Sequence, residues 1–167
     1  MIRKKKKYEK PRKMYETSRI EEENELVKKY GLKTKREIWK TISKVRYYRH
    51  RAMDLARAPL EEQEVLLNKL KSIGLNVNDI TDVLALKVED LLNRRLTSVV
   101  HSKKLANSTK HARQLVVHKK IVVNGRIVNS PSYFVPVMFE SKIEVKTKVN
   151  KPKIENKEES EDSEETI

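Results

Sequence analysis

The amino-acid sequence predicts an α+β protein: a helical N-terminal lobe, then a small module of two helices and a β-hairpin, between a disordered basic arm and a disordered acidic tail. Three observations support this fold class. Apolar residues recur at helical spacing through most of residues 18–118. An Asn-Gly pair at 124–125 stands between β-branched residues, as in a tight hairpin. Both ends are dominated by charge of one sign and lack periodic apolar residues, as disordered segments do.

The charge distribution and the apolar spacing together divide the chain into four predicted regions. Residues 1–13 hold eight Lys or Arg and one Glu, whereas residues 154–167 hold seven acids and one Lys. Because these ends nearly cancel, almost all of the net charge of +14 belongs to the body between them, which should present a folded basic surface. The predicted regions are a basic arm at 1–17, a helical lobe at 18–86, the module at 87–150 with its core at about 94–136, and an acidic tail at 151–167.

Glycine and proline divide the N-terminal lobe into helices. Gly31 and Gly74 stand where helices end, and Pro59 separates two apolar patterns. Thr34 and Glu37 have the spacing of a capping box, in which each side chain bonds the other residue's backbone amide. The predicted elements are helices at 18–30, 35–58 and 60–73 and a connector at 76–82. The buried stripes expected on the second and third helices are Ile38, Ile42, Val45, Tyr48, Ala52 and Leu55, and Leu66, Leu67, Leu70 and Ile73.

The module is predicted to begin with two helices, at 87–101 and 109–118. The first has a buried stripe of Val88, Leu92, Leu96 and Val99. At about 100° per residue, Arg94 lies opposite that stripe and Arg95 lies on its border. Ser108 caps the second helix. Its narrow core face is Ala112, Leu115 and Val116, and its outward face is Lys110, Arg113 and Gln114 together with Val117, which the pattern leaves unexplained.

A hairpin at 121–128 follows these two helices. Asn124-Gly125 suits the two positive φ angles of a two-residue turn. Further strands are predicted where apolar residues alternate: Tyr133, Val135 and Val137 form one candidate, and Ile143 and Val145 form another. Pro131 and Pro136 indicate that these would be edge or irregular strands.

Composition excludes several kinds of site. The chain has no cysteine, so disulfides and Cys-based zinc sites are impossible. Three glycines are too few for a glycine-rich nucleotide loop, and the four histidines do not stand at metal-ligand spacing with acidic partners. No apolar run is long enough for a secretory signal or a membrane span. We therefore expect a soluble intracellular protein that is not an enzyme, with no cofactor, no metal and no membrane partner.

The excess of positive charge indicates a polyanionic partner. Residues 102–139 contain many Lys, Arg and His and no acid. Neutralising a phosphate releases condensed counterions, so a compact basic module favours nucleic acid. The amides at the start of the helix that Ser108 caps add a predicted anion site. Aromatic residues are only 5% of the chain, which disfavours a base-stacking platform and favours recognition of folded RNA through phosphates, 2′-hydroxyls and shape.

The segment RRLTSVVHSKKLANSTKHARQLVVHKKIVVNGRIVNSPSYFVP, residues 94–136, resembles the RNA-binding module named after the fourth protein of the small ribosomal subunit. The segments KKYEKPRKMYETSRIEEENELVKKYGLKTKREIW, RYYRHRAMDLA and VLALKVEDLLNRRL are similar to the N-terminal lobe of the archaeal and eukaryotic form of that protein. Together the resemblance covers about residues 3–147. The acidic tail lies outside it.

The resemblance implies a structural, cytoplasmic ribosomal protein that binds small-subunit rRNA early in assembly, at a multi-helix junction of the 5′ domain. It also implies a contribution to translational accuracy and contact with neighbouring small-subunit proteins, the fifth among them, and the chain is not expected to form a homo-oligomer. Arg113 is the residue expected to contribute most to the RNA contact. The full RNA-binding set, with two arginines of the long helix added, is Arg94, Arg95, Ser108, Thr109, Lys110, Arg113, Gln114, His118, Asn124, Arg126, Arg46 and Arg49.

Three alternatives to a ribosomal protein stay open on sequence alone. A nucleolar-type factor that processes small-subunit rRNA would share the two-part layout. A modification enzyme or synthetase carrying the module would need a further catalytic domain of ~200 residues, for which the chain has no room. A helix-turn-helix DNA-binding protein would fit residues 94–118, but the hairpin that follows at once counts against it.

Overall fold

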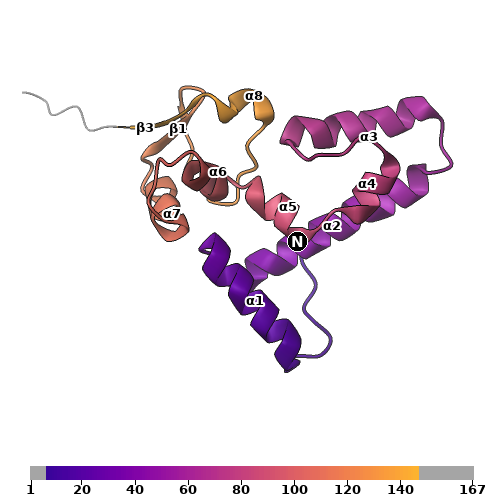
Figure 1. The fold of residues 1–167 in the computed structure, drawn as a ribbon, viewed down its shortest axis with the longest axis horizontal. Helices are drawn as coiled ribbons and strands as arrows, with labels where there is room; N and C mark the ends of the chain where they lie inside the picture. The colour runs from indigo at the N-terminus through magenta and orange to yellow at the C-terminus, as the bar shows by residue number, and fades with distance from the viewer. Residues whose placement is uncertain (1–6, 147–167) are drawn as a thin grey trace, which may run out of the picture.

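The computed structural model describes residues 7–146 and confirms the α+β class (Figure 1). Predictions for the first residues of the basic arm and for the acidic tail fall on residues 1–6 and 147–167, outside the described residues. The helices are α1 (Thr17–Tyr30), α2 (Lys35–Leu55), α3 (Leu60–Ile73), α4 (Ile80–Ala85), α5 (Val88–Asn93), α6 (Leu96–Ser102), α7 (Thr109–Val117) and α8 (Val137–Glu140), and the strands are β1 (Ile121–Val123), β2 (Arg126–Ile127) and β3 (Ile143–Val145).

Helix α2 is the axis of the N-terminal part, with α1 against one end and α3 and α4 along the other half (Figure 1). Its predicted stripe is confirmed, because the side chains of that stripe are buried or half-buried. The predicted connector at 76–82 is partly wrong, since α4 begins within it. Asp82 accepts hydrogen bonds from the backbone amides of Asn78 (2.8 Å) and Asp79 (3.2 Å) and so caps this six-residue helix.

The single helix predicted at 87–101 is wrong, because the chain breaks it at Arg94 and Arg95 into α5 and α6. Arg95 is extended, at φ −74° and ψ 146°, and forms an antiparallel bridge with Phe134. On either side, the Leu96 amide donates to the Tyr133 carbonyl (2.8 Å) and the Val135 amide donates to the Arg94 carbonyl (3.2 Å). These bonds to a segment far along the chain replace the helical bonds that continuation of α5 would have made.

The same bridge corrects the predicted strand through Tyr133, Val135 and Val137. Only Phe134 pairs, as an isolated bridge, and Val137 begins α8. The strand predicted from Ile143 and Val145 is confirmed as β3.

The hairpin prediction is confirmed, and β1 lies at the centre of a three-stranded antiparallel sheet with the order β2-β1-β3. Asn124 and Gly125 take φ angles of 48° and 74°, as the two-residue turn requires. Ile121 and Val123 on β1 are buried, whereas both residues of β2 are exposed. The sheet therefore packs against α6 and α7 mainly through its central strand.

Three clusters of apolar side chains form the core. The first joins α2, α3, α4 and α5, and the second joins α6, α7 and the sheet. The third lies between the end of α1, the start of α2 and α5, around Tyr30, Ile38 and Leu92. Helix α5 thus packs with the N-terminal helices although the predicted module starts at residue 87. The predicted domain boundaries stay predictions.

Gly31 is the C-cap of α1 and also lies against the start of α7. It has φ 60°, and a Cβ added there would lie 3.0 Å from the amide nitrogen of Lys110 and from two atoms of Thr109. We expect Gly31→Ala to lower the free energy of unfolding by more than the ~1–2 kcal/mol that left-handed backbone alone costs, as measured by urea unfolding. Gly125→Ala is the control, since Gly125 has φ 74° but open space around it. Equal losses in the two variants would contradict the contact.

Candidate nucleic-acid interface

Helix α7 presents a basic face because its apolar residues are turned inward. Ser108 caps it as predicted, with its Oγ accepting from the His111 amide (3.2 Å). Ala112 and Val116 are fully buried, as predicted. Leu115, predicted as core, is only half-buried against the same cluster. Val117 faces outward with 51% of its surface exposed, as the helical spacing indicated.

Five of the predicted RNA-binding residues are exposed on the outer side of α7 and on the hairpin turn. They are Lys110, Gln114, His118, Asn124 and Arg126. Lys119 and Lys120, which sequence reasoning did not select, are also exposed in the turn between α7 and β1. The signal for them was present, because they directly follow His118 and precede a buried strand. Within residues 7–146, no ion pair joins these cations to a carboxylate.

Arg113 lies differently from its neighbours on α7, because it is paired inside the protein. Its Nη1 and Nη2 donate to the two carboxylate oxygens of Glu37, at 3.1 and 2.8 Å. Arg95, whose side chain is only 3% exposed, donates to the same carboxylate. One acid at the start of α2 therefore joins α6 and α7, and we call this set the Glu37 cluster. It also corrects the predicted capping box, since Thr34 makes no side-chain cap bond and the Glu37 carboxylate is used elsewhere.

The electrostatics of the Glu37 cluster follow from burial and pairing. Burial alone would raise the pKa of Glu37, but hydrogen bonds from Arg113 and Arg95 outweigh it and hold the pKa below its ordinary value of 4.5. The carboxylate is therefore charged at neutral pH. One acid between two arginines leaves one positive charge in excess beside α7.

Arg94 is also held within the protein, so its predicted outward orientation is wrong. Its Nε donates to the Ile73 carbonyl (2.8 Å), and its Nη2 donates to the Val135 carbonyl (3.2 Å) and to Glu140 (3.0 Å). The break between α5 and α6 causes this, since helical geometry no longer applies at Arg94. Its guanidinium connects α3 to the segment before α8.

The two arginines added from the long helix lie apart from α7. Arg46 is exposed and pairs with Glu9, while Arg49 donates to the Leu86 carbonyl (2.6 Å). Both follow Glu37 by more than two turns along α2. Ser108 and Thr109 do lie at the start of α7, but Gly31 packs there and Ser108 uses one of the amides. The predicted anion site at this helix end is therefore partly covered.

The Glu37 cluster makes stability depend on pH in a defined direction. Because the pKa of Glu37 is lower in the folded protein, the unfolded chain binds more protons as the pH falls below about 4.5. We expect the free energy of unfolding to fall through this range. Glu37→Gln should show a shallower loss between about pH 5 and 3 in urea unfolding. An unchanged acid profile in that variant would contradict the contribution of Glu37.

The part of the chain that the structure describes contains no group of three or more His, Cys, Asp or Glu side chains able to hold a metal ion. Over residues 7–146, no helix is both long and apolar enough to cross a membrane.

Comparison with known proteins assigns the family. A family model described as the S4 domain matches residues 94–138. The small ribosomal subunit protein uS4 of Ignicoccus hospitalis is 47% identical over 136 residues, which is 78% of this chain and 82% of the relative. The chain belongs to the uS4 family. The uS4 protein of Saccharolobus islandicus is 44% identical over 146 residues (83% of this chain, 81% of the relative), and that of Methanothermobacter thermautotrophicus is 44% identical over 145 residues (83% and 84%).

Membership of the uS4 family confirms the resemblance read from the sequence. The S4 domain match begins at Arg94, the residue at which α5 ends and the backbone leaves the helix. It continues through α6, α7 and the hairpin into α8. The uS4 relatives also match across the N-terminal helices, since the matches cover about four-fifths of this chain. The relatives are named as a protein of the small ribosomal subunit.

Proposed function

We propose that this uS4-family chain is a structural constituent of the small ribosomal subunit that binds rRNA through the outer face of α7 and the hairpin turn. The observation that supports this most directly is the set of exposed cations there, Lys110, Lys119, Lys120 and Arg126, which lies within the S4 domain. Gln114 on α7 and Asn124 in the hairpin turn are also exposed, and their side-chain amides can bond 2′-hydroxyls or phosphate oxygens.

The finer parts of the proposal come from the resemblance. The rRNA contact is with the 5′ domain, at a multi-helix junction, and it forms early enough to nucleate assembly. The chain then has neighbouring small-subunit proteins, including the fifth, contributes to translational accuracy and resides in cytoplasmic ribosomes. The exposed cations of the chain support the electrostatic contribution to this rRNA contact, because phosphate contacts give most of the affinity for a folded RNA.

The predicted RNA-binding residues fall into two groups, those whose side chains are bonded inside the protein and those whose side chains are exposed. Arg94, Arg95 and Arg113 make internal hydrogen bonds. Their main contribution to RNA binding is then to position α6 and α7 and to add positive potential. The exposed lysines and Arg126 are the groups that we assign to direct phosphate contact.

A binding assay tests the proposed function. The full-length protein is titrated into a transcript of small-subunit rRNA and, separately, into B-form DNA of similar length, at several salt concentrations. We expect tighter binding to the rRNA, with a steep loss of affinity as salt rises. Equal affinity for the DNA would contradict rRNA recognition and favour the helix-turn-helix alternative.

Sedimentation separates a ribosomal constituent from a processing factor. We expect the tagged protein to remain with mature small subunits through a sucrose gradient. Recovery only with precursor particles would favour the processing factor. The names of the uS4 relatives support the first outcome.

A further inference from the structure

The outward side of the first half of α3 combines exposed apolar and acidic side chains. Leu60 is 74% exposed and Val65 is 65% exposed, and Glu61 and Glu64 are also exposed. At about 100° per residue, these four residues fall within an arc of about 140°, opposite the buried Leu66. We call the four residues the α3 acidic face.

The carboxylates of the α3 acidic face are not neutralised within residues 7–146. The ion pairs in that part of the chain involve neither Glu61 nor Glu64. The helix dipole favours an acid in the first turn, which accounts for Glu61, but the effect fades beyond that turn and does not account for Glu64. Because the two acids are three positions apart, their like charges repel each other. A cationic partner would relieve this repulsion.

The apolar members of the α3 acidic face are also without a partner among the described residues. Helix α3 packs into the core through Leu66 and Leu70, and neither Leu60 nor Val65 belongs to a core cluster. Single exposed apolar side chains are ordinary on a protein surface, but two on one side of the same helix offer an area that a partner can cover. Covering them would remove apolar surface from water.

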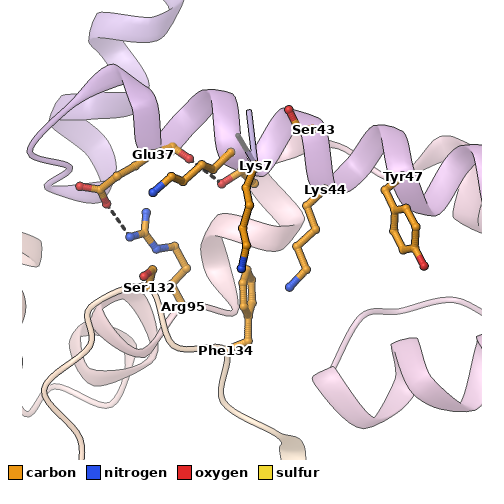
Figure 2. Close-up of a pocket in the computed structure, with 10 residues that line it drawn as sticks. Lys7, Glu37, Ser43, Lys44, Tyr47, Arg95, Ser132 and Phe134 are labelled. Carbon is orange, nitrogen blue, oxygen red and sulfur yellow. Dashed lines mark hydrogen bonds and ion pairs between the residues drawn. The ribbon is translucent and has the colours of Figure 1, made fainter. Parts of the chain in front are cut away.

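The α3 acidic face lies apart from the basic surfaces of the protein. Figure 1 shows the turn between α2 and α3 at one end of the molecule and α7 at the other. Figure 2 shows a surface of the opposite charge, a groove of about 680 Å³ beside α2. Lys7, Lys40 and Lys44 line this groove, and its acidic residue Glu37 is already paired with Arg95. Positive charge of this kind attracts a polyanion, whereas the carboxylates of the α3 acidic face repel one.

We propose that the α3 acidic face docks a basic segment of a neighbouring small-subunit protein. The inference rests on the proposed function, since the neighbour belongs to the same particle. Lys or Arg side chains of the segment would pair with Glu61 and Glu64, and an apolar side chain would cover Leu60 and Val65. A protein segment is favoured over rRNA because the two carboxylates repel phosphate. The contact leaves α7 free for rRNA.

Site-specific photo-crosslinking in assembled small subunits tests this contact. The crosslinking residue p-benzoylphenylalanine replaces Val65 in the full-length protein or, separately, Val117, which is the exposed valine on the outward side of α7. We expect position 65 to crosslink a Lys- or Arg-rich segment of a small-subunit protein, identified by mass spectrometry, and position 117 to crosslink rRNA. Placing the same residue at Leu60 repeats the first measurement at a second position of the face.

Charge reversal tests the chemistry of the contact. Glu61→Lys with Glu64→Lys should lower the yield of the protein crosslink from position 65 by about tenfold or more, because attraction becomes repulsion. Affinity for a small-subunit rRNA transcript should stay at the wild-type value or rise, since the change adds positive charge. The control, Glu21→Lys with Glu25→Lys, makes the same change of charge on exposed acids of α1 and should keep the crosslink. Thermal unfolding of each variant shows that it is folded before yields are compared.

The outcomes separate the α3 acidic face from the proposed function. If position 117 crosslinks rRNA while positions 60 and 65 crosslink rRNA or nothing, the docking proposal is overturned and the proposed function stands. A crosslink from position 65 to the basic arm of the chain itself, or to a protein segment without an excess of basic residues, also overturns the docking proposal. So does an equal loss of the crosslink in the two double variants. If the protein does not enter small subunits, the proposed function fails, and the docking proposal fails with it.

Discussion

Glu37→Ala is expected to lower the free energy of unfolding by about 3–5 kcal/mol, because it leaves two internal arginines without their shared carboxylate. Arg95 has a side chain only 3% exposed, and Arg113 is 19% exposed, so neither guanidinium can be fully hydrated in place. The loss should appear as a lower urea midpoint with an unchanged slope, since the folded state stays compact.

A surface ion pair gives the control for this prediction. Lys29 and Glu89 lie 2.8 Å apart, but both side chains are about half exposed. Glu89→Ala should therefore cost only about 0–1 kcal/mol. If Glu37→Ala cost no more than Glu89→Ala, the Glu37 cluster would not hold α2 to α6 and α7. Glu37→Gln should fall between the two, because an amide accepts through one oxygen only.

Removing two exposed charges from the interface is expected to weaken rRNA binding by at least about 100-fold at low salt, since each bond to a charged group contributes roughly 1.5–3 kcal/mol. The variant is Lys110→Gln with Arg126→Gln, one change on α7 and one on β2, next to the hairpin turn. The salt slope should fall by about two phosphate units. Both residues are exposed, so the unfolding midpoint should stay close to that of wild type.

The matched control removes two charges from elsewhere on the surface. Arg57 and Lys71 are exposed near the ends of α2 and α3. Arg57→Gln with Lys71→Gln should leave the salt slope almost unchanged. An equal loss in both double variants would indicate that net charge, and not the α7 face, determines binding.

Local sequence signals predicted the longer elements well. The stripe along α2 and the burial of Ala112 and Val116 follow from periodicity, which needs only neighbouring residues. The Asn124-Gly125 turn and the Ser108 cap could also be predicted, since each depends only on residues close together in the sequence. The exposed half of the candidate site, including Lys110, Gln114 and Arg126, could therefore be selected from the sequence.

The predictions that were wrong concern residues whose conformation depends on contacts far along the sequence. Arg94 and Arg95 leave the helix because they bond residues 133–135, about forty positions later, and no local pattern shows that pairing. Glu37 had the spacing of a capping residue, yet its carboxylate is taken by arginines 58 and 76 positions away. Residues 102–139 contain no acid, but folding brings one to α7 from α2. Charge counted along the sequence therefore overestimated how free Arg113 is.

Glu37 lies far from Arg95 and Arg113 along the sequence, and this distance affects how the protein folds while it is being synthesised. A growing polypeptide exposes Glu37 to water until residue 95, and then residue 113, has left the site of synthesis. Helices α2 to α5 can pack before that point, since they share a cluster of apolar residues of their own. We therefore expect co-translational folding in two steps, in which neutralisation of Glu37 marks the docking of the C-terminal half.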